Sequence, residues 1–84
     1  MPLFGPPDVD KLKAKKDVGG LIKALENNDY VIKWQAALAL RDLARARSAW
    51  RAVEGLVEAA KDENEKLRSA AFHALLKIGE RPPG

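Results

Sequence analysis

The sequence predicts an all-α protein: a short α-solenoid of two helix–turn–helix repeats behind an N-terminal capping helix. Two observations carry this prediction. The segment that starts at Val18 recurs from Val53, an offset of 35 residues. A period in this range is typical of stacked units that cannot bury their apolar faces alone. Ala, Leu, Lys, Arg and Glu also dominate a composition with few aromatic residues, which favours helix throughout.

The two copies agree at apolar and small positions. The identical pairs are Val18/Val53, Gly20/Gly55, Leu21/Leu56, Ala24/Ala59, Ala36/Ala71, Ala39/Ala74 and Leu40/Leu75. Conservative pairs are Ile22/Val57, Ile32/Leu67, Lys33/Arg68 and Leu43/Ile78. The shared positions recur at helical spacing, so we expect the same helix faces to pack in both copies.

The elements follow in order along one domain, 1–84. Residues 1–16 predict an irregular, proline-rich lead-in and a capping helix that begins after Asp8, a suitable N-cap. Repeat one is expected over 17–47, repeat two over 48–80 and a tail over 81–84. The helices are predicted at 8–16, 17–27, 29–46, 49–61 and 64–79.

Capping residues and turns support these boundaries. Asp17 and Asp29 can cap the two helices of repeat one, and a polar turn lies between those helices in each copy. Gly79 suits a C-terminal cap. Adjacent glycines at 19 and 20 weaken the first of these helices, since each costs roughly 0.5–1 kcal/mol against Ala.

The junction between the copies, residues 44–51, contains neither Gly nor Pro. One interpretation is a break at Arg47-Ser48, with Ser48 as the N-cap and the preceding helix extended by a turn. The other is a single helix from about Asp29 to Lys61, which would open the repeat and favour a swapped dimer. The sequence leaves both open.

Copy two carries a recognisable pattern of paired residues. The pairs are Ala52-Val53, Leu56-Val57, Ala59-Ala60, Asp62-Glu63, Leu67-Arg68, Ala70-Ala71, Ala74-Leu75 and Ile78-Gly79. This pattern resembles the HEAT-like repeats of the phycobilisome-lyase type over roughly residues 17–79. The resemblance implies stacked helix pairs, with Asp62 and Arg68 placed where the family links adjacent repeats. The Gly-Asp-Pro type of turn that usually separates such repeats is missing here.

The residue inventory argues against enzymatic chemistry. One His and no Cys leave no thiolate, no imidazole pair and no convincing nucleophile with its base, so we predict no catalytic residue, no cofactor and no metal site. A cysteine-free chain without a long apolar run suits the cytoplasm, and we expect that location and no membrane association.

Large side chains lie off the core stripe on the second helix of each copy. The predicted protein-binding residues are Trp34, Leu38, Arg41, Arg45, Phe72, His73 and Leu76. An apolar patch with an arginine rim is typical of a protein-binding surface. Alternatively, residues 1–16 fold over Trp34 and make it an internal cap. The sequence leaves both open.

We therefore expect a small scaffold that binds another protein, either a helical partner or a second copy of itself in a homodimer. Two copies are fewer than the three or so repeats that a stable array usually needs. A nucleic-acid-binding module is the alternative, built on Arg41, Arg45, Arg47 and Arg51, although the net charge of only +3 gives it little support. A designed or excised scaffold without a natural partner is a third interpretation.

Overall fold

The computed structural model describes residues 6–80, which form α-helices and one 3₁₀ helix and contain no strand. The elements are α1 (Val9–Ala14), α2 (Val18–Ala24), α3 (Tyr30–Asp42), η1 (Arg47–Ala52), α4 (Val53–Ala59) and α5 (Glu65–Gly79). The predicted all-α solenoid of two repeats behind a capping helix is confirmed. Most predicted helices extend a few residues too far at their C-terminal ends, where the chain forms turns instead of continuing as helix. The predicted tail, 81–84, lies outside the described residues.

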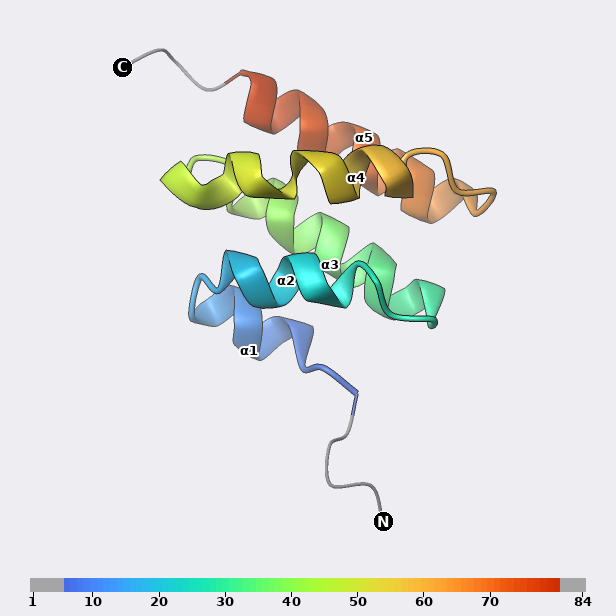
Figure 1. The fold of residues 1–84 in the computed structure, drawn as a ribbon, viewed down its shortest axis with the longest axis horizontal. Helices are drawn as coiled ribbons and strands as arrows, with labels where there is room; N and C mark the ends of the chain where they lie inside the picture. Colours follow the sequence, from blue (N-terminus) through green and yellow to red (C-terminus); the bar gives the residue numbers. More distant parts are fainter. Residues whose placement is uncertain (1–5, 81–84) are drawn as a thin grey trace.

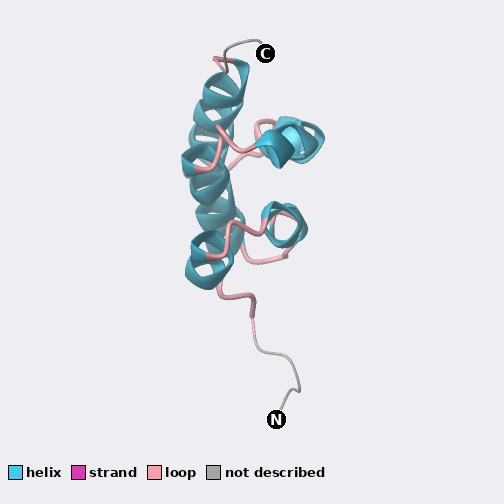
Figure 2. Cartoon of the chain, turned by 90° about the vertical axis from the view of Figure 1, so that its left-hand side faces the viewer, coloured by secondary structure: helices cyan, strands magenta, loops and turns pink. Residues whose placement is uncertain are grey.

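The helices form two layers. Figure 2 shows α1, α3 and α5 stacked in one layer, while α2 and the η1–α4 segment form the other. Figure 1 shows the chain passing between the layers as it climbs from α1 to α5. Capping helix α1 contacts both α2 and α3. It therefore occupies, for repeat one, the place that α3 occupies for repeat two.

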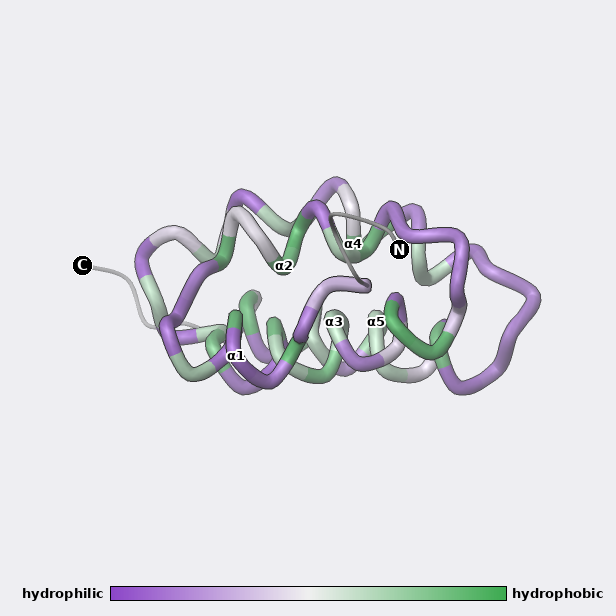
Figure 3. The backbone as a smooth tube through the Cα atoms, turned by 90° about the horizontal axis from the view of Figure 1, so that it is seen from below, coloured by the Kyte–Doolittle hydropathy of each residue, from purple (hydrophilic) through white to green (hydrophobic). Residues whose placement is uncertain are grey.

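The core lies between the two layers and between successive repeats. Leu21, Leu40, Leu56 and Leu67 are fully buried, and each such side chain contributes roughly 1.5–3 kcal/mol by leaving water. Between α3 and α5, which make the most extensive helix contact, the buried positions are mostly alanines. Small side chains let these two helices approach closely. Figure 3 shows that hydrophobic residues lie along the helices of both layers, whereas the turns at the ends of the layers are hydrophilic.

Side-chain caps fix where the helices begin. Asp8, Asp17 and Asp29 accept hydrogen bonds from the backbone N–H groups of Lys11, Gly20 and Val31 at 3.1, 2.8 and 2.9 Å. These three predicted N-caps are confirmed. Each satisfies one of the donors that the first turn of a helix leaves unpaired.

The polar turns obey the 35-residue repeat at atomic detail. Asn27 Oδ1 accepts from the Asp29 N–H at 2.8 Å, and Asp62 Oδ1 accepts from the Asn64 N–H at 2.8 Å. Arg68 Nη1 donates to the carbonyls of Asp62 and Glu63 at 3.3 and 3.4 Å. Arg68 therefore braces the turn within its own repeat, and the expected link from its guanidinium to a neighbouring repeat is not found among the described residues.

The junction between the repeats corrects two expectations. A single helix from Asp29 to Lys61 is wrong, because α3 ends at Asp42 and the backbone of Ala46 is extended (φ −65°, ψ 143°). Ser48 lies inside η1 and makes no capping hydrogen bond there. Burial explains the bend: Ala44 and Ala49 are buried where the chain turns, whereas a continuous helix would carry repeat two away from repeat one.

The turn between α1 and α2 is a Schellman motif. Lys16 adopts a left-handed backbone (φ 56°), its N–H bonds to the Lys13 carbonyl at 2.9 Å, and the Asp17 N–H bonds to the Leu12 carbonyl at 2.9 Å. Glycine usually holds this position because it lacks a Cβ. At the other end of the chain, Gly79 is the last residue of α5 and Glu80 is its C-cap, so the prediction of Gly79 as the cap is wrong by one residue.

Candidate protein-binding surface

Three predicted binding residues meet in one hollow. Trp34 and Leu38 on α3 and His73 on α5 line it together with Lys66, Ser69 and other α5 residues. The Lys66 Nζ lies 5.7 Å from the centroid of the Trp34 ring, a distance at which a cation is attracted to the ring face. Trp34 and Leu38 are partly buried and pack against the core. They therefore join α3 to α5 and keep only part of their surface open.

Phe72 and Leu76 lie on a different side of α5. Both are exposed, by 56% and 48%, and Phe72 lines a second hollow with Ala60 and Arg68. The two hollows adjoin, since Ser69 lines both of them and the rings of Phe72 and His73 have centroids 6.5 Å apart. The predicted set thus spans two neighbouring areas of α5.

Of the two arginines in the predicted rim, Arg41 has another contact. Arg41 Nε lies 3.3 Å from Asp42 Oδ1, and Lys13 Nζ of α1 lies 2.7 Å from Asp42 Oδ2. The hydrogen bond from the Lys13 ammonium, helped by Arg41, holds the pKa of Asp42 below its ordinary value of 3.8. Arg41 therefore belongs to the corner where α1 meets α3. Arg45 is exposed in the turn after α3.

The arginines of the nucleic-acid alternative are spread over both layers. Arg41 lines a small hollow with residues of α1, whereas Arg51 lines a groove between α2 and α4 together with Glu54 and Glu58. Opposed carboxylates lower the positive field that would attract phosphates. Arg41 and Arg51 thus line separate hollows, one beside α1 and one between α2 and α4.

The face of repeat two that points away from repeat one is apolar and open. Its members are Val53 and Val57 on α4, Ala60 as the C-cap of α4, and Phe72, Leu75 and Leu76 on α5. Val53 is 37% exposed while its counterpart Val18 is 4% exposed, and Phe72 is 56% exposed while its counterpart Ala37 is fully buried. In repeat one, the helices that carry these positions contact repeat two: α2 contacts η1, and α3 contacts α5. Among the described residues nothing covers them in repeat two, and we call this face the open end.

Sequence reasoning missed Val53 and Val57 as surface residues. Their match to Val18 and Ile22 predicts that they pack as those residues do in repeat one. The signal that could have found them is the repeat itself: the positions that join repeat one to repeat two must recur, without a partner, on the last repeat described. A core-type apolar face at the end of a stack is therefore a surface.

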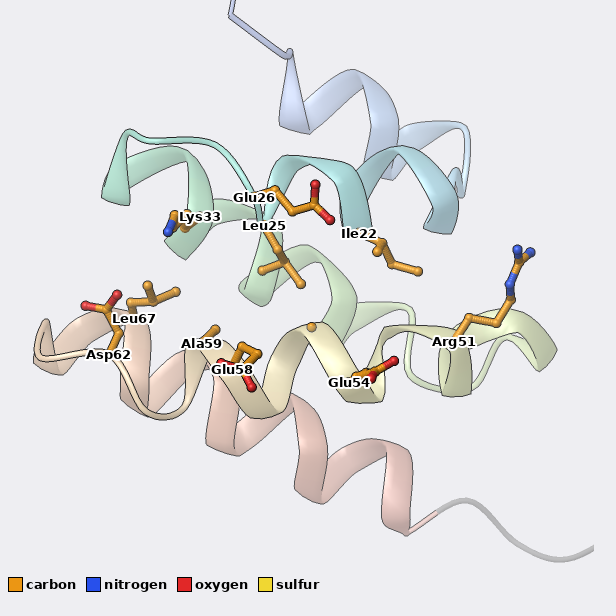
Figure 4. Close-up of a pocket in the computed structure, with 11 residues that line it drawn as sticks. Ile22, Leu25, Glu26, Lys33, Arg51, Glu54, Glu58, Ala59, Asp62 and Leu67 are labelled. Atoms are coloured by element: carbon orange, nitrogen blue, oxygen red, sulfur yellow. The ribbon is translucent and has the colours of Figure 1, made fainter.

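A groove between α2 and α4 was not anticipated either. Figure 4 shows Ile22 of α2 and Leu25, the C-cap of α2, above it and Ala59 of α4 below, with Lys33 and Arg51 toward its two ends. Four carboxylates also line the groove: Glu26, Glu54, Glu58 and Asp62. Within the described part of the chain, no three His, Cys, Asp or Glu side chains come together in a way that could hold a metal ion. The acidic residues are spread along the groove rather than converging on a point.

The length and hydropathy of each helix decide whether it could cross a membrane. Across residues 6–80, none of the helices combines the length and the apolar character that crossing a bilayer requires.

Paired antiparallel helices stacked in two layers, with an uncovered apolar end, define a member of the α-solenoid class of binding proteins. A sequence profile of HEAT repeats matches residues 18–83. The chain therefore belongs to the HEAT-repeat family, whose members generally mediate protein–protein interaction. Comparisons with curated proteins and with solved structures gave no match.

Proposed function

We propose that this chain is a protein–protein interaction module that associates through its open end, including with itself. The observation that carries the proposal is the difference between equivalent positions in the two repeats. Val18 and Ala37 are buried in repeat one, whereas their counterparts Val53 and Phe72 are exposed in repeat two. An apolar face built to core composition on a small protein marks an interaction site.

Binding at the open end would be stabilised by burial of apolar surface, the same effect that holds the two repeats together. Repeat two packs on one face of repeat one, and removing apolar surface from water yields about 25 cal/mol per Å². The open end retains this unsatisfied face. Any partner that presents a complementary helix pair gains the stabilisation that repeat two already gives repeat one.

The hollow at Trp34, Leu38 and His73 is proposed as an adjoining part of the same binding surface. It borders the open end along α5, and Ser69 is common to both hollows. Its contribution is smaller, because Trp34 is half-buried against the core and its ring already lies beside Lys66. Arg41 and Arg45 then lie outside the contact, as charged surface residues of α3 and its following turn.

The proposal describes a scaffold rather than an enzyme. A single His and the absence of Cys support a role without covalent or metal chemistry, and a cysteine-free chain fits a reducing compartment such as the cytoplasm. The placement of the paired alanines supports the phycobilisome-lyase type of HEAT repeat within the family.

Sedimentation equilibrium over a concentration series tests the proposal. The wild type should shift from monomer to dimer with rising concentration, and Leu76→Ser should stay monomeric across the same range while its helical content is unchanged. The control is Tyr30→Ser, which removes a side chain of similar exposure at the start of α3. Association that survives Leu76→Ser but not Tyr30→Ser would contradict the proposal.

A further inference from the structure

One ridge of α5 crosses the open end and carries a regular pattern. Arg68, Phe72, Leu76 and Glu80 follow one another at spacings of four residues, and all four side chains are exposed. Residues at this spacing form a continuous ridge on a helix, and two such ridges interdigitate in the commonest mode of helix packing. Read along the ridge, the pattern is positive, apolar, apolar, negative.

This pattern is complementary to itself when reversed. If a second α5 runs antiparallel across the first, with the two-fold axis level with Ala74, Phe72 meets Leu76 of the other copy. The same operation brings Arg68 to the other copy's Glu80, twice in each dimer. Ser69 and Gly79 flank the ridge and also exchange places, and space is open where a Cβ would stand on Gly79. Small residues at these flanks let two helices approach closely.

The two charges sit at the unfavourable ends of their own helix. Arg68 lies in the first turn of α5 and Glu80 is its C-cap, whereas a helix dipole favours anions at the N-terminus and cations at the C-terminus. In the antiparallel arrangement each charge lies beside the favourable end of the other copy's helix. Their present contacts leave capacity for this: Arg68 makes two long bonds to carbonyls, and Glu80 lies 3.7 Å from Lys77 in an exposed pair.

The opposite end of the stack is unsuited to receive the open end. There α1 already covers repeat one, and α1 and the turn after it carry five exposed charged residues: Asp10, Lys11, Lys13, Lys15 and Lys16. On α2 the exposed positions are Gly19 and Lys23. Head-to-tail stacking would therefore press Phe72 and Leu76 against lysines. A two-fold contact between open ends avoids this and closes the assembly at two chains.

We propose that the open end binds the open end of a second copy of this chain, through antiparallel packing of the two α5 helices. This inference rests on the proposed function and adds to it the partner, the symmetry and the pairing of charges. Phe72 and Leu76 supply the apolar centre of the contact, and the Arg68–Glu80 pairs set its direction. The charge pairs also exclude a parallel alignment, which would place each arginine against the other copy's arginine.

Charge reversal tests the pairing. Arg68→Glu alone and Glu80→Arg alone should each raise the dissociation constant of the homodimer at least about tenfold, since each dimer then contains two like-charge pairs. An equimolar mixture of the two variants should dimerise as tightly as the wild type within about threefold, because each heterodimer then contains two opposite-charge pairs, one of the wild-type sign and one of reversed sign. The double variant should recover in the same way. Lys23→Glu, the same change of charge at the capped end, should leave dimerisation unchanged.

The possible outcomes distinguish a failure of the antiparallel α5 contact from a failure of the proposed binding function. A wild type that dimerises while the mixture of single variants fails to recover overturns the antiparallel α5 contact and leaves the binding function standing. A wild type that stays monomeric at every concentration overturns self-association and the inference together, and leaves a helix pair of another protein as the occupant. Circular dichroism of each variant, unchanged from the wild type, shows that the effects are not losses of folding.

Discussion

The two ends of this small stack differ in whether the apolar face of the repeat at that end is covered. At one end α1, six residues long, covers repeat one with Val9 and turns lysines outward. At the other end α4 and α5 leave Val53 and Phe72 exposed to water. A short amphipathic helix is therefore enough to close a repeat. The described residues close only one of the two ends, and the apolar surface that remains is where binding is expected.

The largest effect should come from comparing one leucine with its counterpart one repeat later. Leu40 is fully buried, whereas its counterpart Leu75 lies at the open end and is partly exposed. Leu40→Ala should lower the free energy of unfolding by about 2–5 kcal/mol, because it leaves a cavity. Leu75→Ala should cost about 1 kcal/mol or less at concentrations where the chain is monomeric. Urea denaturation measures both, and equal losses would contradict the contrast between covered and open repeats.

Substitutions at the adjacent Gly19 and Gly20 test how closely α1 packs against α2. A Cβ on Gly20 would lie 2.8 Å from Leu12 Cδ2 and 2.7 Å from Asp17 Oδ2, the carboxylate that caps α2. Gly20→Ala should therefore destabilise the fold by about 1–2 kcal/mol through loss of that cap and displacement of Leu12. Gly19→Ala is the matched control, since its Cβ would meet only Asp17 Oδ1 at 3.7 Å. It should raise stability by roughly 0.5 kcal/mol, and opposite signs in thermal melts are the expected result.

The turn after α1 offers a way to strengthen the capped end. Lys16 holds a left-handed backbone, which costs a residue with a Cβ about 1 kcal/mol relative to glycine. Lys16→Gly should therefore stabilise the fold by about that amount. Lys15→Gly, one residue earlier in an ordinary helical conformation, should instead lower stability by about 0.5 kcal/mol. Chemical denaturation of the two variants, with the same loss of charge, isolates the backbone term.

The smallest expected effect concerns the ion pair that fastens α1 to α3. Because Lys13 holds the pKa of Asp42 below 3.8, the ionised carboxylate stabilises the fold above that pH, and the contribution disappears as the pH falls through the lowered pKa. Asp42→Asn should cost less than about 1 kcal/mol at neutral pH, since both side chains are well exposed to solvent. The difference between wild type and variant should shrink below pH 3.8.

A control for this last measurement is Glu58→Gln. Glu58 pairs with Lys61 at 3.6 Å within one exposed turn, far from α1, and its loss should leave the stability profile unchanged between neutral and acid pH. An Asp42→Asn variant whose deficit persists undiminished at low pH would show that the hydrogen bond, and not the charge, fastens α1.

Much of the fold follows from local chemistry. The 35-residue recurrence, the alanine positions and the aspartates before each helix of repeat one are local features, and local features are sufficient to place helices and their N-caps. Helix ends were harder to predict. The residues at 43–46 have good helix propensity, and only the packing of Ala44 and Ala49 against the core shows why the chain turns there.

The candidate surface divides in the same way. Periodicity alone placed Phe72, His73 and Leu76 away from the core stripe, and these residues are exposed, because the angle around a helix depends only on residue number. Whether an off-stripe residue meets a neighbour depends on which helices flank it. For that reason Trp34 and Leu38 are partly covered by α5, whereas Val53 is exposed although its counterpart Val18 in repeat one is buried. Sequence determined the repeat and the faces of its helices; tertiary structure decided which face has a neighbour, since burial is a property of the whole stack.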